Sequence, residues 1–252
     1  MRNVKKLTIT KQRRIAVKNA ATAAQHSGKE VCALKSVRIW FKKDGLSRFI
    51  SHLDLNKVMT LAINRSRIPI WHTEGFNPHP FLTFALPLSL GFCGECETMD
   101  IKIEDDSFDI SQIPDKLNMG LPEGIRAYKA AEPVMKPAKI ALASYKLRIG
   151  SDTQSAEEIY NDFNSMLSTD SIITQKKTKK GIKDIDIKPH LSDYSLDVDG
   201  EEVVFFATLP AGSTVNINPI LYINALTEKT GREYYYSGVR TKIMNEAGES
   251  FE

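Results

Sequence analysis

The sequence predicts an α+β protein built from two tandem ferredoxin-like units, each with the order strand, helix, strand, strand, helix, strand. Two observations lead to this prediction. Short apolar runs bounded by turn residues alternate with stretches of helical spacing over residues 37–131, and the same order returns after residue 143. The length of 252 residues fits one large or two small domains, and the repeated order favours two.

Charge separates the start of the chain from the rest. Residues 1–30 hold eight basic side chains and one acid, so the remaining residues sum to −4 although the whole chain is +3. We expect residues 1–34 to be a disordered basic extension, residues 35–134 the first ferredoxin-like domain and residues 135–252 the second. The extension fits a solvated tail, an RNA contact or a mitochondrial-type presequence.

The first unit opens with a strand at residues 37–43, closed by the turn Asp44-Gly45. Ser51 and Asp54 form a capping pattern ahead of apolar residues at helical spacing, which predicts a helix over residues 52–66. We further expect a short strand at 68–71, extended segments at 81–90 and 99–103 around a turn at 91–97, a helix at 110–117 and a strand at 125–131.

Prolines and small residues mark 133–143 as a linker between the units. After it we expect a strand at 145–149, a helix at 156–167, extended segments at 172–198 and 203–209, a helix at 218–230 ended by Gly231, and a strand at 234–244. The lysines between residues 176 and 183 predict a long hairpin or a disordered tip.

The loop Gly75-Phe76-Asn77-Pro78-His79-Pro80 is the most distinctive local sequence. Its two prolines restrict Asn77 and His79 to extended conformations, so the His79 imidazole is held on a stiff backbone. His52 lies in the first turn of the preceding predicted helix. Two converging imidazoles could perform acid–base chemistry on a phosphodiester, contact a ligand or nucleic acid, or act only as hydrogen-bonding struts. The candidate binding residues of this unit are therefore His52, Asp54, Asn77 and His79.

Cys93 and Cys96 have the spacing of one half of a zinc knuckle. The other half would have to come from Cys32, His72 or His79, and no spacing requires it. We expect no metal site, no cofactor and, with three cysteines, no disulfide framework. No apolar run approaches the ~18 residues that a membrane span needs, so we expect a cytoplasmic protein without membrane contact.

The lysine run of the second unit predicts a basic hairpin tip that could contact RNA phosphates through Lys176, Lys177, Lys179 and Lys180. Arg65, Arg67, Arg232, Arg240, Lys242 and the tyrosines at 234–236 could add phosphate contacts and base stacking. A charge run is more often a solvated face. The sequence has no P-loop, Gly-rich dinucleotide motif or Gly-x-Ser-x-Gly elbow, so neither nucleotide hydrolysis nor serine-hydrolase chemistry is indicated.

Five strings within residues 37–103 resemble a bacterial family of uncharacterised function, whose members are typically encoded beside, or fused to, a radical SAM enzyme. The strings are 41–45, 49–54, 75–80, 87–91 and the acidic segment 95–100, and the Gly-Phe-Asn-Pro-His-Pro string at 75–80 is the specific one. The resemblance implies a cytoplasmic bacterial accessory protein with a radical SAM enzyme as its partner and no established reaction. The basic extension, Cys93 and Cys96 depart from the family pattern.

The chain itself lacks the C-x3-C-x2-C motif with which a radical SAM enzyme holds its cluster. We therefore expect a non-catalytic accessory protein that partners such an enzyme and presents an RNA substrate to it. The alternative is an RNA-processing or RNA-modifying enzyme that uses His52 and His79.

Overall fold

The computed structural model describes residues 34–178 and 181–252. The expected basic extension, except for Leu34, lies outside the described residues, as do Lys179 and Lys180. Over the described ranges, no helix is both long enough and apolar enough to cross a membrane.

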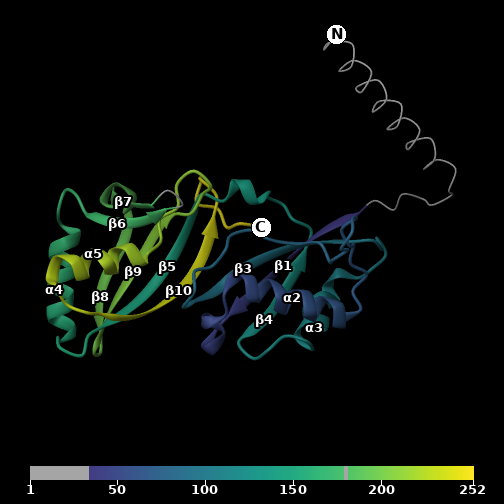
Figure 1. Ribbon diagram of the computed structural model, residues 1–252, viewed down its shortest axis with the longest axis horizontal. Coiled ribbons are helices and arrows are strands. Elements are labelled where there is room, and N and C mark those ends of the chain that lie inside the picture. The colour runs from purple at the N-terminus through teal and green to yellow at the C-terminus, as the bar shows by residue number, and fades with distance from the viewer. Residues whose placement is uncertain (1–33, 179–180) are drawn as a thin grey trace, which may run out of the picture. The chain divides into compact units, whose positions relative to one another are not determined.

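Two runs of elements follow each other along the described residues (Figure 1). The first comprises β1 (Lys35–Lys43), the 3-10 helix η1 (Gly45–Phe49), α2 (His52–Ser66), β2 (Leu82–Phe84), β3 (Phe92–Ile103), η2 (Ile110–Gln112), α3 (Ile113–Asn118) and β4 (Ile125–Ala131). The second comprises η3 (Pro137–Lys139), β5 (Leu142–Gly150), α4 (Ala156–Leu167), β6 (Ile173–Thr178), β7 (Gly181–Asp186), η4 (Lys188–His190), β8 (Asp193–Asp199), β9 (Glu202–Pro210), α5 (Ile220–Thr230) and β10 (Tyr235–Met244).

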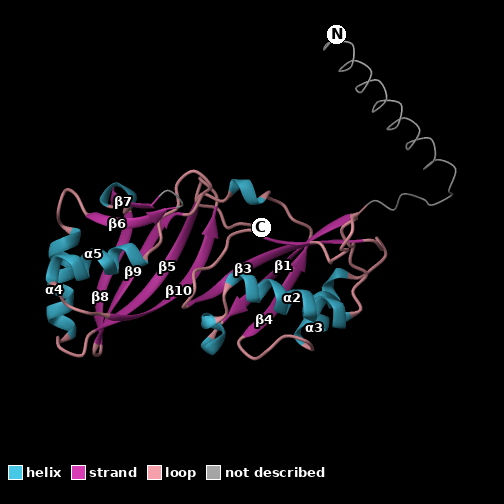
Figure 2. Ribbon diagram, viewed as in Figure 1, coloured by secondary structure: helices cyan, strands magenta, loops and turns pink. Residues whose placement is uncertain are grey.

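Eight of these strands form one mixed sheet (Figure 2). Its order is β4-β1-β3-β10-β5-β9-β8, β2 also pairs with β3, and β6 and β7 form a separate hairpin. Neighbouring strands are antiparallel, except that β10 runs parallel to β3 over the short register from Gly238 to Arg240. The protein is therefore α+β with a large mixed sheet, as predicted at that level.

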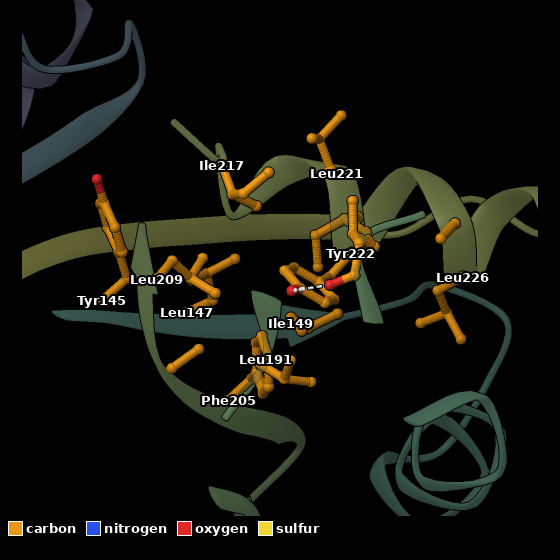
Figure 3. Packing of buried hydrophobic residues seen from close by; sticks show 14 of the residues in the cluster. Tyr145, Leu147, Ile149, Leu191, Phe205, Leu209, Ile217, Leu221, Tyr222 and Leu226 are labelled. Carbon is orange, nitrogen blue, oxygen red and sulfur yellow. Dashed lines mark hydrogen bonds between the residues drawn. The ribbon is translucent and has the colours of Figure 1, made fainter. Parts of the chain in front are cut away.

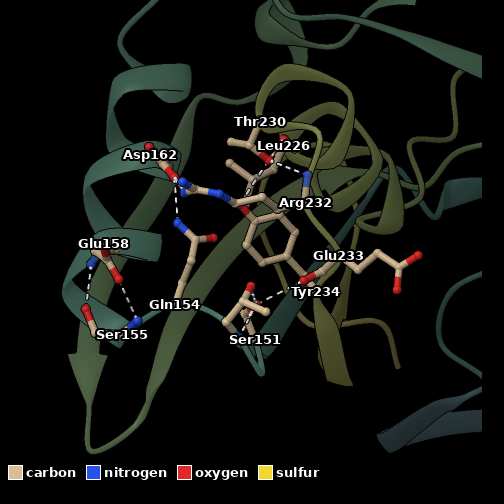
Figure 4. Close-up of polar contacts among 11 residues, drawn as sticks. Ser151, Gln154, Ser155, Glu158, Asp162, Leu226, Thr230, Arg232, Glu233 and Tyr234 are labelled. Carbon is tan, nitrogen blue, oxygen red and sulfur yellow. Dashed lines mark hydrogen bonds and ion pairs between the residues drawn. The ribbon is translucent and has the colours of Figure 1, made fainter.

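Local capping explains why two helices begin where the sequence predicts. Ser51 precedes α2, and its hydroxyl accepts a hydrogen bond from the Asp54 amide. At α4, Ser155 and Glu158 form a complete capping box: each side chain accepts from the other residue's amide (Figure 4). Both helices have the expected bounds.

Helices cover one set of alternate strand side chains in each run. In the first run, apolar residues of β1, β3 and β4 pack against α2 and α3 in one cluster, which includes Val37, Ile39, Phe41, Leu55, Met59, Met99, Ile101 and Leu117. In the second run, residues of β5 and β9 pack against α4 and α5 (Figure 3). There the Tyr222 hydroxyl, deep in the cluster, donates a hydrogen bond to the Ile187 carbonyl at 3.0 Å.

A buried ion pair lies where β10 meets β3. The Arg240 guanidinium donates from Nε to Glu97 Oε1 at 2.9 Å and from Nη2 to Glu97 Oε2, and it also donates to the carbonyls of Leu86 and Pro87. Both side chains are almost fully buried. Although burial disfavours its charge, the pKa of Arg240 is raised because of Glu97.

The turn expected at residues 91–97 is wrong, since β3 begins at Phe92. Its first residues pair with β10, and Glu97 faces Arg240 across this pairing. A Cβ at Gly94 would lie 2.3 Å from Glu97 Oε1, so the glycine makes room for the carboxylate rather than for a turn. Conversely, the extended segment expected at 81–90 forms a strand only at 82–84.

Candidate docking surface and nucleic-acid interface

His52 is the first residue of α2, and its imidazole packs edge-on against Phe84, with the ring centroids 5.1 Å apart. Asp54 completes the cap: its carboxylate accepts from the Ser51 hydroxyl at 2.7 Å and pairs with Lys57 at 3.0 Å. These bonds, first that from Ser51, lower the pKa of Asp54. Asp54 therefore serves the helix start, and its side chain is already engaged.

Asn77 and His79 lie at the tip of an extended hairpin-like segment. The Thr73 amide donates to the His79 carbonyl, and residues 72 and 80 form a bridge below the tip. His79 Nδ1 lies 3.0 Å from Thr73 Oγ1 and 3.1 Å from the Asn77 carbonyl oxygen. This imidazole braces its own loop, and no contact between it and His52 occurs among the described interactions.

The lysine run lies on the hairpin of β6 and β7, in the place that the sequence predicts for a hairpin. Lys176 donates from Nζ to the Asn216 carbonyl at 2.7 Å, which fixes the side chain against the segment before α5. Lys177 belongs to β6, whereas Lys179 and Lys180 lie outside the described residues.

Two arginines named from the sequence as phosphate contacts are already paired. Arg240 is buried against Glu97, and Arg232 pairs with Asp162 at 3.2 Å, an interaction that also involves Gln154 (Figure 4). Lys242 is exposed and remains available to a ligand.

Cys93 and Cys96 lie in the first half of β3, an interior strand of the sheet. Burial raises the pKa of Cys96 to about 12 and raises that of Cys93 as well. Among the described residues no group of three histidines, cysteines or acids is placed to hold a metal ion.

An exposed apolar surface surrounds the start of α2, and the sequence reasoning did not identify it. Its members are Leu46, Phe49, Leu53 and Leu90, which are 84%, 59%, 74% and 61% exposed. They lie on adjoining segments, because η1 leads directly into α2 and the Gly91 amide donates to the Arg48 carbonyl at 2.9 Å. We call these four residues the apolar docking surface. Contiguous exposed apolar side chains are typical of protein-binding sites.

The sheet face opposite the helices pairs lysines with aromatic rings. Lys129 Nζ lies 4.4 Å from the centre of the Trp40 ring, and Lys146 Nζ lies 5.3 Å from that of Phe206. Lys242, on β10 between them, is exposed. We call Lys129, Lys146, Phe206 and Lys242 the uncovered sheet face; Trp40 is only 5% exposed and lies beneath Lys129.

Two adjoining grooves follow this face. One, of about 270 Å³, is lined by Trp40, Lys129 and the last described residues of the chain, and the other, of about 300 Å³, by Ser144, Phe206 and Thr208. Thr241 and Lys242 line both. Alternation along β1, β5 and β9 is the signal that could have grouped these residues, but it does not say which face the helices leave open.

Comparisons with known proteins give one family and distant structural likenesses. The profile of a family described as uncharacterised proteins conserved in bacteria matches residues 36–219. No curated protein matches. Among solved structures, a chain of a Cbf5-Nop10-Gar1 complex is 11% identical with a TM-score of 0.45, covering 83% of this chain and 50% of that one. This chain thus spans half the length of that match.

A protein of unknown function from Galdieria sulphuraria is 12% identical, with a TM-score of 0.25, over 82% of this chain and 99% of that one. A putative glycine cleavage system transcriptional repressor is 11% identical, with a TM-score of 0.23, over 82% and 98%. We draw no function from these likenesses.

Proposed function

We propose that this chain, which belongs to a bacterial family of uncharacterised proteins, DUF2344, is a non-catalytic accessory protein that docks onto a radical SAM enzyme and presents an RNA strand to it. The observation that carries the proposal is a pair of surfaces: one bears exposed apolar side chains, and the other bears lysines beside aromatic rings.

The apolar docking surface supports the protein–protein part. Three of its four residues belong to the strings that carry the resemblance: Phe49 and Leu53 to the string 49–54, and Leu90 to the string 87–91. Phe76, in the string 75–80, is fully exposed as well. Large apolar side chains in water cost free energy unless a partner covers them, so a cytoplasmic enzyme partner accounts for their position.

The uncovered sheet face supports the RNA part. The ring of Phe206, which is 40% exposed, can stack an unpaired base, while neighbouring lysines neutralise phosphates. Within the described ranges, Lys146 and Lys242 form no ion pair. Lys129 forms one with Glu252, and its Nζ lies 3.2 Å from Glu252 Oε1. The grooves along this face would seat a single strand rather than a duplex.

The strand order also supports two tandem ferredoxin-like units as the scaffold for these surfaces. In the first run the order β4-β1-β3-β2 is antiparallel throughout, and in the second the order β10-β5-β9-β8 repeats it, with β6 and β7 as an insertion. This is the strand order that a split βαβ arrangement with two helices on one face would have.

Anaerobic pull-down of a radical SAM enzyme by the tagged protein tests docking. Leu53→Asp should abolish retention of the enzyme, because a carboxylate would have to be buried in the contact. Leu61→Asp is the matched control: Leu61 is also an exposed leucine of α2, 53% exposed, but lies two turns further along. Equal retention by both variants, or no retention by the parent protein, would exclude this docking surface.

The alternative, an RNA-processing enzyme using His52 and His79, predicts a different result. His79→Gln would then abolish cleavage or modification of RNA with the fold intact. The bonds of His79 to its own loop favour a bracing role instead. An RNA substrate processed equally well by this variant would remove His79 from any mechanism.

A further inference from the structure

A third groove lies at the opposite end of the sheet from Phe206. It encloses about 430 Å³ between β1, the end of β3, the segment before β2 and residues 133–137. This volume is within the range of small-ligand sites. Its wall includes the apolar side chains of Phe81, Val134 and Met135 and the hydroxyl residues Ser36 and Thr83.

The charged groups of this groove leave it positive. Asp100 is the acidic residue that lines the groove. Arg38 donates to both of its carboxylate oxygens, from Nε at 2.7 Å and from Nη2 at 2.8 Å. Lys102 and Lys136 also line the groove, and neither forms an ion pair among the described residues. Lys102 Nζ instead lies 4.9 Å from the centre of the Phe81 ring and 5.3 Å from that of Trp71. The excess charge therefore fits an anion.

Arg38 adds a buried N–H group that has no acceptor among the described residues. Its side chain is fully buried beneath the Phe251 ring, whose centre lies 4.0 Å from the guanidinium carbon. Its Nη1 group has no hydrogen-bond partner within the described part of the chain. Buried donors in native proteins are nearly always paired, so this one is an exception, and it lies out of reach of solvent behind the wall to which Arg38 contributes.

We propose that this groove holds one nucleotide of the RNA strand, with the base against Phe81 and the phosphate between Lys102 and Lys136. The proposal rests on the function proposed above. It names one position on the sheet at which a single base is bound. A flat ring and an anionic phosphate match the apolar wall and the two unpaired ammonium groups, whereas an acidic peptide would leave the aromatic wall unused.

The chain's two tryptophans provide separate reporters. Trp71 lies next to Phe81, a residue that lines this groove, and the centroids of the two rings are 5.7 Å apart. Trp40 lines a different groove, the one beside Lys129. In the Trp40→Phe protein, all tryptophan emission comes from Trp71. In the Trp71→Phe protein, it comes from Trp40.

The experiment titrates both single-tryptophan proteins with a single-stranded hexaribonucleotide and, separately, with each of the four nucleoside 5′-monophosphates. We expect saturable quenching of Trp71 by the hexamer and by at least one monophosphate. Lys102→Gln combined with Lys136→Gln should weaken both about tenfold and should flatten the salt dependence by about 0.7 for each phosphate that is no longer neutralised. Lys116→Gln combined with Lys229→Gln removes the same charge from α3 and α5, away from the groove, and is the matched control.

The outcomes separate this proposal from the proposed function. Hexamer binding seen by filter retention, with Trp71 silent and the lysine variant equal to its control, would overturn the nucleotide site while leaving RNA presentation intact. A parent protein that retains no RNA on the filter would overturn both. A Trp71 response to a monophosphate but not to the hexamer would overturn the assignment to an RNA strand.

Discussion

Burial sets the chemistry of Cys96 at the residue scale. The pKa of its thiol is raised to about 12 because the side chain is withdrawn from water beside the Glu97 carboxylate, whereas the ordinary value is 9.0. In the folded protein the thiol therefore keeps its proton across the range where an unfolded chain loses it. The stabilising contribution of this neutral thiol is complete below pH 9 and is lost as the pH rises toward 12.

We predict that iodoacetamide at pH 8.5 alkylates Cys96 far more slowly in the native protein than in urea, because the thiolate is the reacting form. Mass spectrometry of the peptide that contains Cys96 measures both rates. Labelling at the same rate in native and unfolded protein would contradict the burial of this thiol.

The start of α4 carries the clearest stability prediction at the element scale. Ser155→Ala removes the hydroxyl that accepts from the Glu158 amide and should lower the free energy of unfolding by about 1 kcal/mol. Asn164→Ala, at an exposed position inside the same helix, should leave stability unchanged or slightly raised, since alanine has the higher helix propensity. Urea unfolding curves compare the two, and equal midpoints would mean that the cap contributes nothing.

The β6–β7 hairpin is a second element whose role can be tested. If its lysines contact RNA, changing Lys176, Lys177, Lys179 and Lys180 to Gln should alter the preference among RNA sequences as well as the affinity, because Lys176 is held against the Asn216 carbonyl and presents its charge from a fixed place. Filter binding at several salt concentrations measures both. Replacing Lys57, Lys116, Lys139 and Lys229 by Gln is the charge-matched control, and a hairpin variant that matches it on every RNA would identify a solvated face.

The Arg240–Glu97 pair decides a prediction at the scale of the whole molecule, because it lies where the two runs of strands join. Glu97→Gln leaves a buried guanidinium without its carboxylate and should cost about 3–5 kcal/mol of unfolding free energy. The double variant Glu97→Leu, Arg240→Met removes both charges and should cost less than the single change. Denaturant unfolding measures both variants. A double variant less stable than Glu97→Gln would show that packing, not charge pairing, dominates the stability of the contact between β3 and β10.

Local signals explain which parts of this architecture could be predicted from sequence. The bounds of α2 and α4 follow from a capping residue and apolar spacing within a dozen positions, so they were predicted correctly. The prediction of a turn at 91–97 was wrong because Gly94 leaves room for the Glu97 side chain and pairs with β10, a strand far along the chain. Alternation in β1 places Arg38 and Trp40 on the same side of the strand, but only tertiary packing tells that the helices cover the other side. The exposure of Leu53 and Phe49 is likewise invisible to periodicity.

The short parallel register between β3 and β10 has a consequence for synthesis. Glu97 and Arg240 are 143 positions apart in the chain, which at ~5–20 residues per second means that roughly 7–30 s separate their emergence during translation. Until β10 is made, the start of β3 and, once it has been synthesised, one edge of β5 lack the same strand, and unpaired edges of this kind recruit other chains. Expression at a lower temperature or with a chaperone that binds nascent chains should therefore raise the soluble yield, and slow codons between residues 100 and 235 should lower it.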